Sequence, residues 1–248
     1  MKRTNKVLLV LLMVLVFLAG LAIILYPYYQ GVTVDTALQK DALQFYEWLE
    51  KLPAKPVVPI PGETIPESED IPYPELLDAM QAYNQFLWED EQSGLRDPWS
   101  YRQPSFSLKE YGLDSEIFGV ISIPRLNLEM PLYLGATNEH LAAGAAHLSQ
   151  TSLPIGGDNT NCVIAGHRGY GGATYFKYIT DLQPGDTVTI TNLWESLTYT
   201  VYETKIIKPY EVDKIHIQEG KELLTLLTCH PYASGGKYRY LVFCQRTD

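Results

Sequence analysis

The chain has 248 residues, which is enough for one domain with a substantial core plus further segments. Its formal net charge of −10 argues against a nucleic-acid partner, because such a partner requires a basic face. The three cysteines include no Cys-x-x-Cys pair, which argues against a zinc site or a thioredoxin-like dithiol.

A transmembrane anchor is predicted at the start of the chain. Lys2, Arg3 and Lys6 precede the uncharged, apolar residues 7–25, a run long enough to cross a bilayer as a helix. The basic residues 1–6 should stay in the cytoplasm, so the rest of the chain is expected outside. A cleaved signal peptide is the alternative, but the run is long for one, and YPYYQGV is a poor cleavage site.

Residues 26–116 are expected to form an extracellular region of helices and linkers. Apolar residues recur at three- and four-residue steps in 35–52, which predicts an amphipathic helix, and 76–92 is a second helix candidate. Residues 53–74 are rich in proline and acidic residues and predict an extended linker. Residues 93–105, SGLRDPWSYRQPS, predict a loop.

The sequence pattern changes at residue 117, where a mainly β domain is predicted to run to residue 248. Many short strands with few helices favour a barrel or a sandwich. The strand candidates are two runs within 117–135 that break near Pro124, and the runs at 161–166, 186–192, 196–212, 222–228 and 238–243.

Cys229 ends the strand candidate ELLTLLT, and a strand end is a rigid place to present a nucleophile. A thiol needs a helper because only the thiolate attacks well. His167 also stands where an apolar run meets a glycine-rich loop, and a hairpin would return Arg239 near Cys229. By position alone each has a commoner explanation, namely packing, a surface imidazole or an ion pair.

The other two cysteines, Cys162 and Cys244, lie in apolar strand candidates. Buried thiols and a mutual disulfide are both open, because the sequence gives no distance between them.

These residues carry a family resemblance. TLLTC with the downstream Arg239 resembles the sortase signature, and AGHRG around His167 resembles the sortase histidine loop. The stretch GAAHLSQTSLPIGGDNTNCVIAGHRGY and the motif TCHPY are similar to the class C, pilin-polymerising branch. Several separate motifs in the right order are specific. The resemblance implies a closed β-barrel of about eight strands with short helices, preceded by N-terminal helices and a lid loop.

The class C resemblance also implies a role for the loop before the β domain. Class C sortases cover the active site with an Asp-Pro-aromatic motif, and Asp97, Pro98 and Trp99 match it. By this resemblance Trp99 lies over Cys229, and Asp97 reaches toward Arg239. Many class C sortases carry a second, C-terminal membrane helix. Because the sequence stops at Asp248, soon after the last strand candidate, we expect only the N-terminal anchor.

The resemblance implies a membrane-anchored cysteine transpeptidase of Gram-positive cells. Its substrates would be pilins or surface proteins with an LPxTG-like signal, cut between Thr and Gly and joined to a pilin lysine. Cys229 would be the nucleophile, Arg239 the oxyanion donor, His167 the proton donor and Thr228 a substrate contact. No metal or organic cofactor is implied. The alternatives are a sortase that uses a cell-wall amine, a thiol peptidase with water as acceptor, and a non-enzymatic adhesin or pilus-assembly domain.

Overall fold

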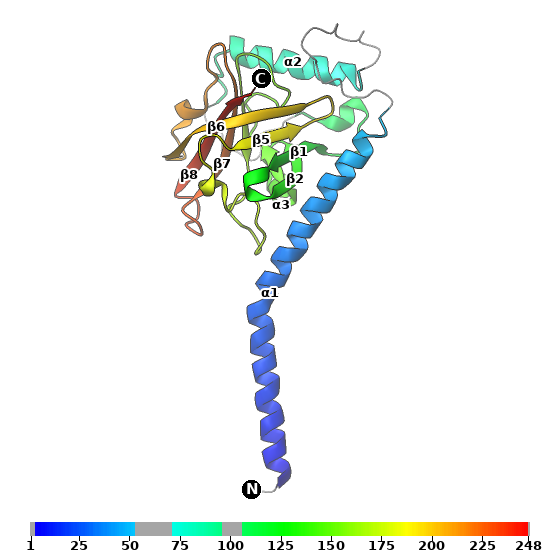
Figure 1. The fold of residues 1–248 in the computed structure, drawn as a ribbon, viewed down its shortest axis with the longest axis vertical. Coiled ribbons are helices and arrows are strands. Elements are labelled where there is room, and N and C mark those ends of the chain that lie inside the picture. Colours follow the sequence, from blue (N-terminus) through cyan, green and yellow to red (C-terminus); the bar gives the residue numbers. More distant parts are fainter. Residues whose placement is uncertain (1–2, 53–70, 96–105, 248) are drawn as a thin grey trace.

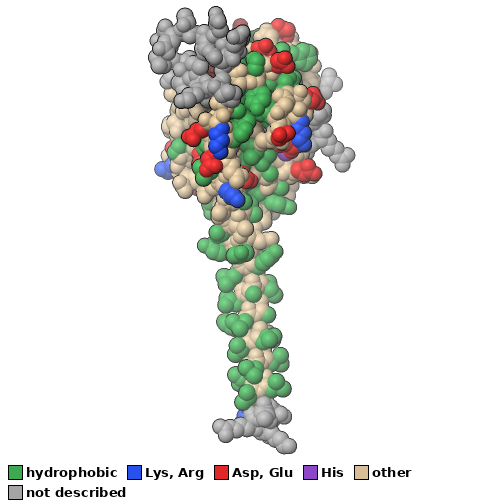
Figure 2. Space-filling model, turned by 90° about the vertical axis from the view of Figure 1, so that its right-hand side faces the viewer, with side chains coloured by type: hydrophobic (Ala, Val, Ile, Leu, Met, Phe, Trp, Pro, Cys, Tyr) green, Lys and Arg blue, Asp and Glu red, His purple; other side chains and the backbone are tan. Residues whose placement is uncertain are grey.

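The computed structural model describes residues 3–52, 71–95 and 106–247. A β-barrel lies beside the second half of one long helix, α1 (Arg3–Leu49), and the first half of that helix projects away from the barrel (Figure 1). Apolar side chains surround the projecting half (Figure 2). This distribution differs from that of a helix in a soluble core, where one face would be covered.

The α1 helix joins two segments that the sequence predicts separately, the anchor at 7–25 and the amphipathic helix at 35–52. The hydroxyl groups of Thr33 and Thr36 donate to carbonyls four residues earlier, which follows helical geometry. Pro27 lies inside the helix, and Figure 1 shows the axis bending part-way along its length. A single proline removes one backbone hydrogen bond and bends a helix, so it need not end one.

The second helix, α2 (Pro74–Glu89), confirms the helix candidate at 76–92 except for its last three residues. Glu91 and Gln92 have positive φ angles of 50° and 51°, so the backbone leaves the helical region there. The buried Asn84 fixes α2 to the barrel: its Oδ1 accepts from Leu153 N at 2.7 Å, and its Nδ2 donates to Leu153 O at 3.3 Å.

Eight strands form a closed barrel in the order β1-β2-β3-β4-β7-β8-β6-β5, which confirms the expected fold. The pairs are antiparallel except for β2 with β3 and β4 with β7. The strands are β1 (Ile117–Ile123), β2 (Leu128–Leu134), β3 (Ala145–His147), β4 (Thr160–Ala165), β5 (Thr187–Thr191), β6 (Ser196–Ile207), β7 (Glu222–His230) and β8 (Tyr238–Arg246). Short 3-10 helices are η2 (Leu108–Tyr111), η3 (Pro124–Leu126), η4 (Ile179–Asp181) and η5 (Val212–Ile215).

Alternation along the strands separates the barrel interior from an outer apolar face. On β7, Leu224 and Leu226 belong to the interior cluster, which draws on all eight barrel strands. Leu227 belongs to a second cluster on the outer face, with Ala165 of β4 and Leu241 of β8. Because successive side chains point to opposite faces, Cys229 lies on the same outer face as Leu227.

Two short elements, α3 (Asn138–Ala143) and β3, are absent from the sequence-based prediction. Six and three residues are too few for a periodic pattern to be distinguished from a loop. The β3 strand matters because it carries His147, which is fully buried. His147 Nε2 lies 3.1 Å from Thr151 O, and Nδ1 has no hydrogen-bond partner among the described residues.

Stability should fall on acidification because of His147. Burial lowers its pKa to about 4, so between pH 6.5 and 4 the unfolded chain binds a proton that the folded chain does not. The free energy of unfolding should therefore drop by about 3 kcal/mol over that window, at roughly 1.4 kcal/mol for each pKa unit. Thermal unfolding of the full chain in detergent at several pH values measures this. His147→Gln should make the free energy of unfolding less dependent on pH, whereas His216→Gln, at a half-buried position, should leave that dependence unchanged. Equal slopes of the unfolding free energy against pH for the native protein and both variants would contradict this prediction.

Candidate active site

Cys229 and Arg239 are direct partners in the β7–β8 ladder, as the sequence pattern predicts. Cys229 is partly exposed, whereas Arg239 is only 8% exposed. The Arg239 Nη1 donates to Gly236 O at 2.6 Å and to Tyr238 O at 3.2 Å. These bonds to the β7–β8 turn and to the first residue of β8 hold the guanidinium in a fixed orientation beside the thiol.

Gly236 lies between the two side chains and was missed by the sequence analysis. A Cβ added there would be 3.0 Å from Arg239 Nη1 and 3.4 Å from Cys229 Sγ, and its φ angle is +80°. Both the space and the backbone conformation therefore require glycine. The signal in the sequence is the pair Gly235-Gly236 three residues before the arginine, which marks a turn but does not show what the turn faces.

The position of His167 follows from the parallel pairing of β4 with β7. Ala165 pairs with Leu227, and Gly166 continues the alignment: its N donates to Leu227 O at 3.1 Å, and its O accepts from the Thr228 hydroxyl at 2.7 Å. Continuing this alignment by one more residue places His167, two residues past the end of β4, level with Cys229. The structure thus brings His167, Cys229 and Arg239 to one rim of the barrel.

Two tyrosines hold the His167 ring, and neither was singled out from the sequence. The Tyr170 ring stacks on the imidazole with centroids 4.7 Å apart, and the Tyr175 ring meets its edge at 5.9 Å. Partial burial lowers the pKa of His167. A lowered pKa makes the imidazolium a better proton donor, since the charged form loses its proton more readily.

Thr228 faces the barrel interior, opposite to Cys229. It is 1% exposed, and its hydroxyl donates to Gly166 O as described above. Its observed contact therefore links the cysteine strand to the residue before His167.

The remaining histidines lie elsewhere. His140 stacks on Tyr133 with ring centroids 5.0 Å apart, and His147 is buried in β3. His230 follows Cys229 on β7 and faces away from it, as the strand alternation predicts. Its Nδ1 contacts Arg168 Nη1, and its pKa is lowered by burial and, to a lesser degree, by the Arg168 charge.

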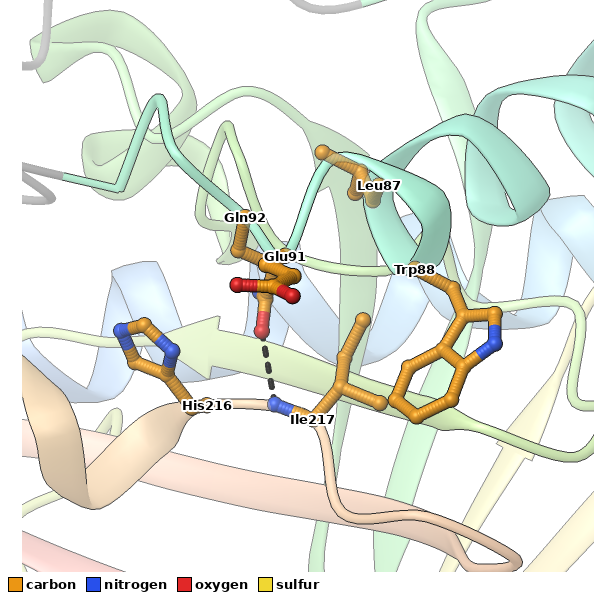
Figure 3. Close-up of a pocket in the computed structure, with 6 residues that line it drawn as sticks. All are labelled: Leu87, Trp88, Glu91, Gln92, His216 and Ile217. Carbon is orange, nitrogen blue, oxygen red and sulfur yellow. Dashed lines mark hydrogen bonds between the residues drawn. The ribbon is translucent and has the colours of Figure 1, made fainter.

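His216 lines a shallow pocket of about 400 Å³ between the end of α2 and the loop before β7 (Figure 3). The side chain of Gln92 spans the pocket and accepts from Ile217 N at 2.6 Å. None of the three candidate catalytic residues lines this pocket, so it belongs to the attachment of α2 and not to the rim that carries Cys229.

The expected lid residues, Asp97 and Trp99, lie outside the described residues. The chain before them is informative, since Leu95 is 3% exposed and packs in the outer cluster with Leu227 and Leu241. These two leucines lie two residues from Cys229 and Arg239 along their strands, so Leu95, the last described residue before 96–105, belongs to the apolar cluster of the face that carries Cys229.

Comparisons with known proteins identify the family. Residues 121–247 match the Sortase domain family. This chain belongs to the sortase family.

Solved sortase structures share the fold over most of the chain. Sortase C1 of pilus island 1 of Group B Streptococcus is 28% identical and superposes with a TM-score of 0.69, covering 85% of this sortase and 92% of that chain. Sortase C-1 from Actinomyces oris is 30% identical with a TM-score of 0.60, covering 70% and 99%.

Curated relatives match over shorter stretches. Sortase D of Bacillus subtilis is 30% identical over 130 residues, which cover 52% of this sortase and 63% of that protein. Sortase A of Streptococcus agalactiae is 30% identical over 117 residues, 46% and 47% of the two chains. The matched stretches thus span less than two thirds of either curated relative.

The three cysteines of this sortase are free thiols, which answers the question of a Cys162–Cys244 disulfide. Both of those side chains are almost fully buried in the barrel interior. Burial raises the pKa of each far above the ordinary value of a thiol, so neither forms a reactive thiolate near neutral pH.

Alkylation should therefore select Cys229. We expect iodoacetamide to add one label to the native full chain, at Cys229, and three labels after unfolding. Intact mass and peptide mapping measure both numbers. Cys229→Ala is the control and should take no label in the native state. Labelling of Cys162 or Cys244 in the folded protein would contradict this prediction.

Proposed function

We propose that this sortase is a class C transpeptidase that cuts an LPxTG-like signal between Thr and Gly and joins it to a pilin lysine. The observation that carries the proposal is the convergence of Cys229, Arg239 and His167 on one rim of a sortase barrel. The pilus sortases among the solved structures with this fold support the choice of substrate class.

The first step forms a thioester. The Cys229 thiolate attacks the Thr carbonyl carbon, and Arg239 donates N–H groups to the resulting oxyanion. The C–N bond to glycine then breaks, and His167 in its charged form gives the departing amine its proton. The contacts of Arg239 with Gly236 and Tyr238 pre-orient the guanidinium, so little reorganisation is needed during the reaction.

The second step transfers the acyl group. The lysine amine attacks the thioester carbonyl, the C–S bond breaks, and the amine proton passes to the neutral His167 imidazole. Thiolate and imidazolium are thereby restored. Excluding water favours aminolysis over hydrolysis. Neither step needs a metal or an organic cofactor.

The lid belongs to the same proposal. An indole from Trp99 would shield the thiol, and a carboxylate from Asp97 would pair with Arg239 until substrate displaces it. The position of Leu95 in the outer cluster supports this, because that cluster includes Leu227 and Leu241 on the face that carries Cys229. Thr228 would act on substrate through its bond to Gly166, which sets the path of the histidine loop.

Attachment to the membrane is proposed through α1. It is the one helix in the described part of the chain that is long and apolar enough to cross a bilayer. Tyr26, Tyr28 and Tyr29 follow the apolar run and are all more than half exposed, as residues of an interfacial belt would be. The catalytic domain would then lie outside a Gram-positive cell and meet membrane-held pilins or surface proteins at raised effective concentration.

A reconstituted reaction tests the proposed function. The full chain in detergent is incubated with an LPxTG-type peptide and a lysine-bearing pilin domain, with a cell-wall amine as the competing acceptor. We expect an acyl adduct on Cys229 that resolves to a peptide–lysine isopeptide bond. Mass spectrometry identifies both species. Cys229→Ala should form neither, and Asp97→Ala with Trp99→Ala should increase the adduct by opening the lid.

The other outcomes separate the alternatives. Transfer to the cell-wall amine alone would indicate a sortase that anchors proteins to peptidoglycan. Hydrolysed peptide with no transfer would indicate a peptidase. A folded protein without any adduct would contradict the catalytic proposal and leave a binding role.

Gly236→Ala should lower the rate of adduct formation by at least about tenfold, because an added methyl group displaces Arg239 or Cys229, and small misplacements are costly. Gly235→Ala is a matched control: its φ angle is also positive, at +67°, but an added Cβ meets no atom within 4 Å. The two variants therefore share the backbone strain and differ only in crowding of the site. Equal rates of Cys229 acylation for Gly236→Ala and Gly235→Ala, measured in a quenched time course, would contradict the prediction.

A further inference from the structure

The second half of α1 touches the loop that carries His167, residues 166–176, without intervening side chains. A Cβ added at Gly31 would be 2.2 Å from Gly172 O, and one added at Gly172 would be 2.2 Å from Pro27 O. The φ angle of Gly172 is +87°, which also favours glycine. The two backbones thus meet at a distance that only glycine at both positions allows.

One turn further along α1, Asp35 binds the same loop through both carboxylate oxygens. Its Oδ1 accepts from Thr174 N at 2.8 Å, and its Oδ2 accepts from the Thr174 hydroxyl at 2.8 Å. Hydrogen bonds to a charged acceptor are about twice as strong as those between neutral groups. Asp35 therefore fixes the backbone and the side chain of Thr174 together.

The next residue, Tyr175, transmits this constraint to His167. It is 2% exposed and has a φ angle of 39°, an uncommon conformation for an aromatic residue. Such conformations persist only where neighbouring contacts hold them. Its ring lies against the His167 edge, and Phe176 N donates to His167 O at 2.9 Å, closing the loop.

We propose that Asp35 is a positioning residue for His167, so that the proposed membrane-anchor helix is also part of the framework of the active site. The predicted effect of Asp35 on catalysis rests on the proposed function. The claim that α1 holds the histidine loop in place rests only on the contacts of α1 with Gly172 and Thr174.

The helix would also set the height of the loop above the membrane. Gly31 lies six residues beyond the apolar run 7–25, about 9 Å along a helix that rises 1.5 Å per residue. The headgroup layer is roughly 5–8 Å thick on each side. The His167 loop would thus lie at the outer edge of the headgroups.

The test uses the full chain in lipid nanodiscs. We expect Asp35→Ala to lower the rate of acylation of Cys229 by about 10- to 100-fold, as misplacement of a catalytic group does. Amide hydrogen exchange over residues 168–174 should become at least about tenfold faster, because the opening free energy falls. The His167 pKa, measured by NMR of the imidazole, should rise toward its ordinary value as the ring becomes more exposed.

Two further variants make the test specific. Thr174→Val removes the hydroxyl donor alone and should show a smaller effect in the same direction, and combining it with Asp35→Ala should add less than the sum of the two. Glu47→Ala, an exposed carboxylate on the same helix, is the matched control and should change none of the readouts. If Asp35→Ala does not fold, the acylation rate, the hydrogen exchange and the His167 pKa of Thr174→Val provide the test.

Failure of this inference is distinguishable from failure of the proposed function. Unchanged exchange and an unchanged His167 titration in the variants that fold would overturn the positioning role, whatever the activity. A native protein that forms no adduct, while Asp35→Ala still releases the loop and shifts His167, would overturn the function and leave the positioning role supported.

Discussion

The pairing of β7 with a different strand on each side is the constraint on which the site depends. Antiparallel pairing with β8 sets Arg239 opposite Cys229, and parallel pairing with β4 brings the chain after Ala165 level with the same cysteine. Because side chains alternate, a shift of one residue in either register would turn the partner residue to the opposite face of the sheet. The barrel interior fixes both registers, since Ile164, Leu226 and Val242 must all face inward together.

Backbone contacts around this strand do much of the positioning. The Gly166 backbone bonds Leu227 and Thr228 on β7, and the Arg239 guanidinium donates to one carbonyl of the β7–β8 turn and to one at the start of β8. Such contacts orient the side chains before any substrate arrives, which is how a site reduces the reorganisation that a reaction requires. The helix α1 adds a third support through Asp35, so direct contacts connect α1, the histidine loop and the cysteine strand. A sortase with this arrangement would hold its reactive groups at a set height above the membrane and act on substrates held there.

The outer face of the barrel joins the site to the N-terminal region. Asn84 and Gln92 fasten α2 and its C-terminal turn to the loops after β3 and before β7, and Leu95 then joins the outer apolar cluster. This attachment explains why Gln92 accepts a left-handed conformation, since its side chain bonds backbone groups of both loops. The path of the chain up to Leu95 is thereby set by packing that no local pattern encodes.

Local sequence patterns predicted most of the elements and the candidate chemistry. Short strand-like runs between turn signals predicted seven of the eight barrel strands, the apolar run predicted the projecting helix, and motifs in order indicated Cys229, His167 and Arg239 as candidates. These patterns did not reveal β3, the continuity of α1, or the roles of Gly236, Tyr175 and Asp35. The physical reason is that strand patterns and motif spacing involve residues close together in the sequence. Asp35 and Thr174 are 139 residues apart and meet only in the folded chain. Only the folded structure shows that Gly236 has no room for a side chain and that the Asp35 carboxylate holds the histidine loop.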